Sequence, residues 1–210
     1  MSKVKICGLS RAEDVTAVNR ALPDYIGFVF APSRRHVDER TAAVLKERLD
    51  RRIKAVGVFV NQEIETVAGL YRSGAIDLAQ LHGDEDADYI ARLKERCGCP
   101  VIKAISVGNA LPPLPGTADY YLFDTLSDGR GGTGKAFDWS VLQKYGGLPY
   151  FLAGGLSIAN ITDAIHSLAP FCIDVSSGAE TDGKKDADKI VQIVRLVRAG
   201  LTASETGDPC

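Results

Sequence analysis

The sequence predicts a single-domain (β/α)8 barrel, a closed ring of eight parallel strands. Eight short apolar runs recur at intervals of about 25 residues, and each is followed by a helix-compatible segment or the remnant of one. Such alternation is typical of parallel strands joined by right-handed crossovers. Polar residues also follow strand ends along the whole chain, whereas a doubly wound open sheet gathers its ligand residues at one switch point. The open sheet is the rival fold, and it is disfavoured because no Gly-x-Gly-x-x-Gly follows the first strand.

The expected strands are apolar runs bounded by glycine, proline or polar residues. They cover residues 3–7, 25–30, 53–60, 79–82, 100–105, 120–124, 150–153 and 171–175. The expected helices cover residues 11–21, 37–49, 61–71, 84–95, 138–145, 158–168 and 186–199. Asn61 is the expected N-cap of the third helix. Residues 106–117 contain three prolines and two glycines, so the crossover after the fifth strand is expected to be degenerate.

A chain of 210 residues is short for this fold, for which about 250 residues are typical, so tight loops are expected. We expect residues 1–200 to form the catalytic barrel. Residues 201–210 carry no pattern and are expected to be a mobile C-terminal tail. No surface stripe indicates an interface, and a monomer is therefore favoured.

Composition excludes several classes of function. A net charge of −2 offers no basic field for nucleic acid, and no apolar run approaches the roughly 18 residues that cross a membrane. The five cysteines are odd in number and follow no secretory segment, so we expect reduced thiols in a cytoplasmic protein. Cys97 and Cys99 are too close together for a zinc knuckle, and no second pair lies near a histidine. No metal is expected.

The first strand places a lysine and a cysteine on the same face. Lys5 and Cys7 are two residues apart, and Gly8 stops the strand directly after the thiol. Cys7 is either a nucleophile or base at a strand mouth or an inert buried thiol. Lys5 either favours the thiolate by its charge or pairs with an acid inside the barrel.

In a barrel of this class the active site lies at the carboxyl ends of the strands. Five strands end in, lead to or carry polar residues that can do chemistry. These residues are Cys7, Arg34, Arg35, Gln80, His82, Asp124 and Asp174. Any one of them can be structural, but five such strand ends together indicate a site.

Two glycine-rich segments indicate what is bound. Gly154 and Gly155 follow the seventh strand, and Ser176, Ser177 and Gly178 follow the eighth. Barrels commonly build a phosphate site after these two strands, from backbone amides that approach the anion closely. The alternative is two ordinary turns. The position favours a phosphorylated small molecule.

A glycine-dense loop follows the sixth strand. Gly132, Thr133 and Gly134 lie in this loop, which is expected to cover the substrate as a lid or else to be a plain flexible segment. Asp128 in the same loop competes with Asp124 as an acid, but it does not lie on a strand.

The motifs together closely resemble those of phosphoribosylanthranilate isomerase, from the first strand to the eighth and in the same order. They are Lys5-Ile6-Cys7-Gly8-Leu9, Ser33-Arg34-Arg35, Gln80-Leu81-His82-Gly83-Asp84, Phe123-Asp124, Gly131-Gly132-Thr133-Gly134, Phe137-Asp138-Trp139, Ala153-Gly154-Gly155-Leu156 and Asp174-Val175-Ser176-Ser177-Gly178. The resemblance implies a single-domain barrel of tryptophan biosynthesis that uses no cofactor and no metal. It also implies the conversion of N-(5-phosphoribosyl)anthranilate to 1-(2-carboxyphenylamino)-1-deoxyribulose 5-phosphate by an Amadori rearrangement.

The resemblance also assigns roles to residues. The catalytic base falls on Cys7, the catalytic acid on Asp124, and the arginine of the second loop on Arg35, where a planar guanidinium suits the anthranilate carboxylate. His36 stands where an aromatic residue often follows that arginine. Asp174 is expected to contact a sugar hydroxyl or amine. Gln80 and His82 either line the site or satisfy each other.

Other functions stay open at this point. Another phosphosugar isomerase or lyase on the same barrel is the nearer alternative, and the related enzyme of the histidine pathway looks like a user of two aspartates. A metal-dependent pentulose-phosphate epimerase would need several histidines at strand ends, and only His82 qualifies. A non-catalytic module that binds phosphometabolites leaves the pairing of Cys7 with Asp124 unexplained.

Overall fold

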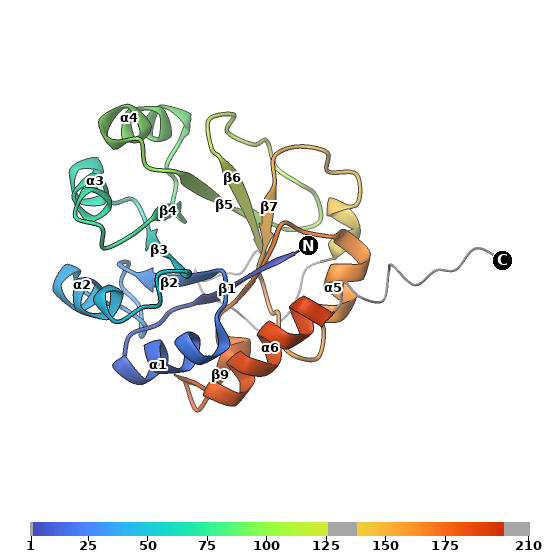
Figure 1. The fold of residues 1–210 in the computed structure, drawn as a ribbon. Coiled ribbons are helices and arrows are strands. Elements are labelled where there is room, and N and C mark those ends of the chain that lie inside the picture. The colour runs from blue at the N-terminus through green and yellow to red at the C-terminus, as the bar shows by residue number, and fades with distance from the viewer. Residues whose placement is uncertain (1, 126–137, 200–210) are drawn as a thin grey trace.

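The computed structural model of the chain describes residues 2–125 and 138–199. Eight parallel strands form a closed barrel in sequence order, with β1 hydrogen-bonded to both β2 and β8 (Figure 1). The helices form an outer ring around the strands. The predicted (β/α)8 fold is confirmed.

The strands are apolar on both faces because one face fills the barrel and the other packs under the helices. They are β1 Lys3–Cys7, β2 Tyr25–Val29, β3 Lys54–Phe59, β4 Leu78–Leu81, β5 Val101–Val107, β6 Tyr120–Thr125, β7 Tyr150–Leu152 and β8 Cys172–Val175. Aromatic and aliphatic side chains, including Tyr25, Ile102 and Phe151, fill the interior. All eight lie where the sequence predicts strands, within a few residues at each end.

Six α-helices lie among the described residues. They are α1 Ala12–Ala21, α2 Glu39–Glu47, α3 Ile64–Arg72, α4 Ala87–Cys97, α5 Ile161–Leu168 and α6 Ala187–Ala199. Two begin at aspartate caps, where Asp38 accepts a hydrogen bond from the Thr41 amide and Asp86 accepts one from the Tyr89 amide. In the described part of the chain, no helix has both the length and the apolar character needed to cross a bilayer.

Asn61 does not cap α3, contrary to the sequence-based expectation. The helix begins at Ile64 with Glu63 at the N-cap position, and Asn61 adopts a left-handed conformation with φ of 51°. The backbone N–H of Asn61 donates to Glu85 Oε1 at 2.6 Å, and the side-chain oxygen of Asn61 accepts from the backbone N–H of Asp84 at 2.7 Å. Asn61 therefore ties the loop after β3 to the loop after β4.

The crossovers of the second half are irregular, as the prolines predict for one of them. No helix forms between β5 and β6, whose intervening residues are all described. The expected helix over 138–145 is wrong, because only a 3-10 turn, η1 (Trp139–Leu142), forms there. Asp138 caps this turn through the Ser140 amide, and two glycines and a proline follow before β7.

A short unit that the sequence analysis did not predict lies between β8 and α6. A 3-10 turn, η2 (Ser177–Ala179), leads into an antiparallel hairpin of β9 (Glu180–Thr181) and β10 (Lys184–Lys185). Asp182 and Gly183 join the two strands with φ of 49° and 74°. An Asp-Gly pair with both φ angles positive is a strong local hairpin signal.

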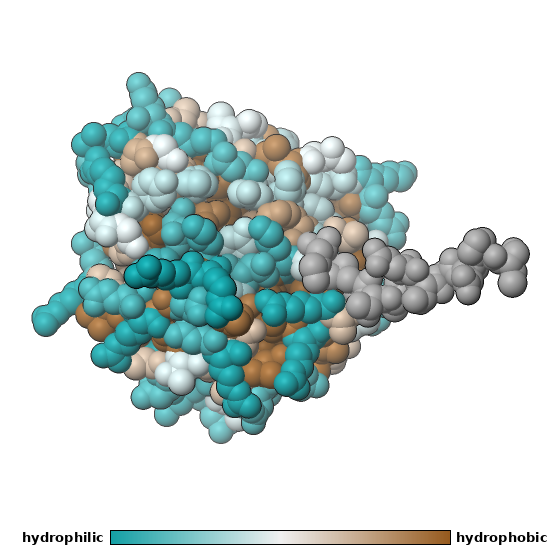
Figure 2. Space-filling model, viewed as in Figure 1, coloured by the Kyte–Doolittle hydropathy of each residue, from teal (hydrophilic) through white to brown (hydrophobic). Residues whose placement is uncertain are grey.

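Figure 2 shows one face of the molecule, on which hydrophilic residues dominate and hydrophobic residues lie between them. Among the described residues, the large hydrophobic side chains that are exposed are Val44 and Leu148, and these are far apart in the sequence. Neither of them forms part of the barrel mouth.

Candidate functional site

Cys7 lies at the carboxyl end of β1, in a space that a neighbouring glycine leaves open. The residue is 9% exposed and pairs in register with Gly27 of β2. A Cβ atom on Gly27 would lie 2.7 Å from Cys7 Sγ, so a larger residue there would collide with the thiol. The sequence analysis did not identify Gly27 as part of the site.

Gly8 makes room for an arginine beside this thiol. Its φ is 86°, and a Cβ atom at this position would lie 2.3 Å from Arg35 Cδ. The backbone after Cys7 thus passes directly under the Arg35 side chain. The structure therefore brings the end of β1 and the arginine of the second loop together.

Asp124 lies near the carboxyl end of β6, three strands from β1 around the ring. Its Oδ1 accepts a hydrogen bond from the Thr125 amide at 2.8 Å, and its Oδ2 lies 3.6 Å from His82 Nε2. Desolvation by burial raises the pKa of Asp124 to about 6, against the Thr125 hydrogen bond that lowers it. A tenth of these carboxyl groups would then keep their proton at about pH 7, far more than for an ordinary aspartate.

The surroundings of Cys7 disfavour its thiolate form. Burial raises its pKa, while the charges of Lys5 and Lys185 offset part of this effect and that of Asp174 adds to it. The charge of Lys5 thus favours the thiolate, but burial outweighs it. Lys185, from the hairpin after β8, is a second cation that the sequence analysis did not foresee.

Lys5 is fully buried and joins three strands of the barrel. Its Nζ donates to Asp174 Oδ2 of β8 at 2.7 Å and to Gln80 Oε1 of β4 at 2.8 Å. Gln80 Nε2 in turn lies 3.0 Å from His82 Nδ1. Lys5, Gln80, His82, Asp174 and Asp124 thus form one polar network across the barrel mouth.

Within the part of the chain that the structure describes, one of the two carboxylate oxygens of Asp174 is hydrogen-bonded and the other is not. Its Oδ2 is used by Lys5, but its Oδ1 is buried and has no hydrogen-bond partner among the described residues. A buried acceptor left without a donor is costly unless a bound molecule supplies one. This unmatched oxygen fits the predicted contact with a substrate hydroxyl or amine.

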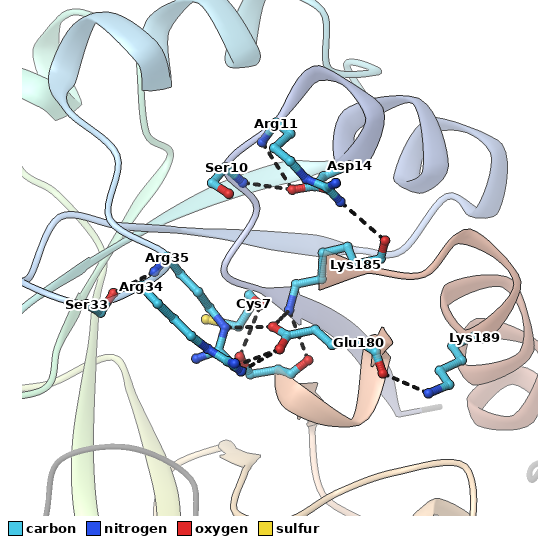
Figure 3. A network of polar contacts seen from close by, with 11 residues as sticks. Cys7, Ser10, Arg11, Asp14, Ser33, Arg34, Arg35, Glu180, Lys185 and Lys189 are labelled. Carbon is cyan, nitrogen blue, oxygen red and sulfur yellow. Dashed lines mark hydrogen bonds and ion pairs between the residues drawn. The ribbon is translucent and has the colours of Figure 1, made fainter. Parts of the chain in front are cut away.

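Arg35 is held by a glutamate that the sequence analysis missed. Glu180 Oε1 accepts from Arg35 Nε at 2.7 Å, and Oε2 accepts from Arg35 Nη2 at 3.1 Å. Arg34 Nη2 and Lys185 Nζ donate to the same carboxylate at 2.6 and 2.8 Å. Figure 3 shows Glu180 among these three cations, with Cys7 close by. Although burial opposes it, these bonds hold the pKa of Glu180 below its usual value.

The hairpin that carries Glu180 also contacts the end of β1. Lys185 Nζ donates to the Ser176 carbonyl at 2.9 Å, and Ser176 Oγ donates to the Cys7 carbonyl at 3.3 Å. The Lys185 side chain is 1% exposed. The Asp182-Gly183 turn was the sequence signal that could have revealed this hairpin.

The glycine-rich segments after β7 and β8 lie against each other, and the segment after β7 also lies against Asp124. A Cβ atom on Gly178 would lie 2.1 Å from the Leu156 carbonyl oxygen. Gly154 has φ of 86°, and a Cβ atom there would lie 2.3 Å from Thr125 Oγ1 and 3.0 Å from Asp124 Oδ1. Gly155, with φ of 64°, continues this left-handed turn. The predicted phosphate segments therefore adjoin each other, and the one after β7 adjoins the predicted acid.

The predicted lid residues Gly132, Thr133 and Gly134 and the competing acid Asp128 lie outside the described residues. Within residues 2–125 and 138–199, no group of three or more His, Cys, Asp or Glu side chains is arranged to hold a metal ion.

The chain matches the model of the family described as N-(5'-phosphoribosyl)anthranilate (PRA) isomerase over residues 4–196. An N-(5'-phosphoribosyl)anthranilate isomerase of Endomicrobium trichonymphae is 50% identical over 200 residues, which cover 95% of this chain and 100% of the relative. The same enzyme of Clostridium acetobutylicum is 45% identical over 206 residues, covering 94% of this chain and 98% of the relative.

Solved structures agree with this match. Phosphoribosyl anthranilate isomerase of Thermotoga maritima superposes with a TM-score of 0.83 at 34% identity, covering 95% of this chain and 100% of that one. Another phosphoribosyl anthranilate isomerase, in complex with reduced 1-(O-carboxyphenylamino)-1-deoxyribulose 5-phosphate, has a TM-score of 0.80 at 32% identity over 95% of this chain and 100% of that one. The family match, these identities and the closed barrel lead to one conclusion: the chain belongs to the N-(5'-phosphoribosyl)anthranilate isomerase family and is an isomerase of tryptophan biosynthesis.

Proposed function

We propose that the barrel mouth converts N-(5-phosphoribosyl)anthranilate to 1-(2-carboxyphenylamino)-1-deoxyribulose 5-phosphate with Asp124 as the acid and Cys7 as the base. One observation carries this assignment. A carboxyl group whose pKa is raised to about 6 and a buried thiol lie at strand ends three positions apart around one ring, so they can face a substrate from different sides.

The acid opens the sugar ring. Asp124 gives its proton to the ring oxygen as the bond between that oxygen and C1 breaks, and the nitrogen lone pair forms the C1=N bond of a Schiff base. The aspartate is left as a carboxylate, and the former ring oxygen becomes a hydroxyl group. Burial prepares Asp124 for this step, because it raises the fraction of the carboxyl that holds a proton.

The base completes the rearrangement. The cationic nitrogen acidifies the hydrogen on C2, the Cys7 thiolate takes that proton, and the electron pair forms an enolamine. Protonation at C1 and loss of the proton from the C2 hydroxyl then give the aminoketone. Lys5 and Lys185 assist because their charges favour the thiolate that burial disfavours.

Binding is divided among three groups in this proposal. Arg35 binds the anthranilate carboxylate, since Glu180 occupies its Nε and Nη2 and so fixes the plane of the guanidinium. Asp174 Oδ1 binds a sugar hydroxyl or the amine. The phosphate is bound by the two glycine-rich segments, through Gly154, Gly155, Ser176, Ser177 and Gly178.

Inorganic phosphate should then compete with the substrate, and Ser177→Ala should weaken that competition. A rate that does not change with added phosphate would contradict the phosphate assignment.

We further propose a cytoplasmic monomer. Cys7, Cys97, Cys99 and Cys172 are free thiols, which suits a reducing compartment. The dimeric phosphoribosylanthranilate isomerase of Thermotoga maritima has also been solved as generated monomers, which supports the proposal that such a barrel folds without a partner. Light scattering at working concentration should give the mass of one chain, and cell fractionation should place the protein in the cytoplasm.

The activity itself is tested by turnover of freshly made N-(5-phosphoribosyl)anthranilate, followed as fluorescence loss above its spontaneous decomposition. We expect the parent to turn over and both Cys7→Ala and Asp124→Ala to fall by about 10²-fold or more while circular dichroism stays unchanged. An inactive parent that still binds the phosphate ester would point to another phosphosugar reaction or to a binding module.

The pH profile follows from the direction of the two shifts. The productive form of the site has a protonated Asp124 and a Cys7 thiolate. The more stable form has an Asp124 carboxylate and a Cys7 thiol. Both forms hold one proton, so their ratio does not change with pH between the two pKa values. We expect kcat/KM to be flat from about pH 6 to above the pKa of an ordinary thiol, and to fall on both sides. Because the substrate phosphate also titrates near pH 6, a carbon-13 titration of the Asp124 carboxyl should assign the acid limb. A carboxyl that titrates below about pH 4.5 would refute the assignment.

Two substitutions inside the barrel should shift the Cys7 pKa in opposite directions. Lys5→Met removes a charge that favours the thiolate, so the pKa should rise, whereas Asp174→Asn removes a charge that disfavours it, so the pKa should fall. The rate of alkylation of Cys7 against pH measures both. Opposite shifts cannot come from general loosening of the core. If both substitutions moved the Cys7 pKa in the same direction, or did not move it, Lys5 and Asp174 would not control the charge of this thiol.

Arg35→Lys tests the carboxylate contact. Lysine cannot reproduce the planar fork, so we expect KM to rise by about 10- to 100-fold, the equivalent of a lost charge-assisted hydrogen bond. Arg34→Lys is the matched control, because Arg34 contacts the same Glu180 but its side chain is 58% exposed. Equal effects of the two substitutions would argue against a special role for Arg35.

A further inference from the structure

The buried network around Lys5 determines the direction of a neighbouring amide. The Lys5 ammonium carries only donors, and it lies 2.8 Å from Gln80 Oε1. The opposite orientation of this amide would place its NH2 group against the ammonium, donor against donor. Gln80 is 1% exposed, so water has little room to offer a substitute. Its amide oxygen must face Lys5, and its NH2 group must face away.

The amide in turn determines the tautomer of a histidine. Gln80 and His82 are two residues apart at the end of β4, so their side chains lie on the same side. Gln80 Nε2 lies 3.0 Å from His82 Nδ1, and an amide NH2 group only donates. His82 Nδ1 must accept this hydrogen bond and carries no hydrogen. The proton of the neutral ring is therefore on Nε2.

The protonated nitrogen faces the proposed acid. His82 Nε2 lies 3.6 Å from Asp124 Oδ2, slightly beyond hydrogen-bond distance. An N–H at this position can tighten onto the carboxylate that Asp124 becomes after it gives up its proton. A doubly protonated ring there would instead stabilise the carboxylate before the reaction and deprive the acid of its proton.

We propose that Gln80 is a positioning residue which, oriented by Lys5, holds His82 as the neutral Nε2–H tautomer facing Asp124. The tautomer follows from hydrogen-bond geometry alone, and its effect on turnover rests on the proposed role of Asp124. Gln80 would act through His82 without touching the reacting atoms. His82 would support the acid after proton transfer, as a neutral donor.

The experiment reads the tautomer directly. In protein labelled with nitrogen-15 histidine, the two ring nitrogens have distinct shifts according to which carries hydrogen. At about pH 8 we expect His82 Nδ1 to be unprotonated and Nε2 to be protonated. His36 and His166 are exposed and serve as references in the same spectrum. An Nδ1–H tautomer or a doubly protonated ring in the parent protein would overturn the proposal.

Gln80→Glu is the decisive variant. It keeps the shape of the side chain and its bond to Lys5, but it places an acceptor opposite His82 Nδ1. We expect His82 to gain a proton on Nδ1, the references to stay unchanged, and kcat to fall by about tenfold or more with KM changed less, since part of the acid catalysis is lost. A shifted tautomer with unchanged kcat, or an unchanged tautomer, would overturn the positioning role.

Two variants of His82 complete the test if Gln80→Glu does not fold. A glutamine side chain can place its NH2 group near the position of Nε2, whereas alanine cannot. His82→Gln should therefore keep more of the parent kcat than His82→Ala, and equal losses would contradict the proposal. If Asp124→Ala stays active while the tautomer is as expected, the assignment of the acid fails and the inference about Gln80 stands.

Discussion

The arrangement of the site depends on a positive charge inside the barrel. Lys5 has no exposed surface, and its ammonium is held by Asp174 and Gln80. Burying such a pair is expensive, and well-packed apolar side chains would often stabilise a core equally well or better. Much of the barrel interior is instead filled by apolar and aromatic side chains, among them Tyr25, Ile102 and Phe151. We assign the buried Lys5 ammonium a role in the site, because its hydrogen bonds connect β1 with β4 and β8 and orient the side chain of Gln80.

A second charge cluster flanks the thiol on its other side. Glu180 pairs with Arg34, Arg35 and Lys185, so one buried carboxylate offsets part of the charge of three cations. Lys5 pairs with Asp174 in the barrel interior. Burial is the largest influence on the pKa of Cys7, and the negative charge of Asp174 adds to it, whereas Lys5 and Lys185 oppose it. Burial raises the pKa of both groups, Cys7 and Asp124, so near neutral pH Cys7 holds its proton and about a tenth of the Asp124 carboxyl groups hold theirs.

Much of the fold and part of the site could be predicted from the sequence, because both depend on local patterns. The strands are short apolar runs, and the ends of parallel strands share one edge, so Cys7, Asp124 and Asp174 could be grouped without coordinates. The partners of these residues could not be predicted. Glu180 meets Arg35 across 145 residues of chain, and nothing near either residue announces the other. Asn61 resembles a cap in sequence, but its amide is taken by Glu85 on the next loop.

The hairpin of β9 and β10 links the last part of the barrel to the first. Lys185 and Glu180 reach the neighbourhood of Cys7 from the far end of the chain, and Ser176 bonds the carbonyl of Cys7 across 169 residues. Such contacts span most of the chain, so their loop-closure entropy must be met before they stabilise anything. The thiol consequently lacks its surroundings until β8 has docked against β1. An incomplete barrel, on the ribosome or after a C-terminal truncation, would expose a more ordinary and more reactive cysteine, and its protection from alkylation marks the moment the ring closes.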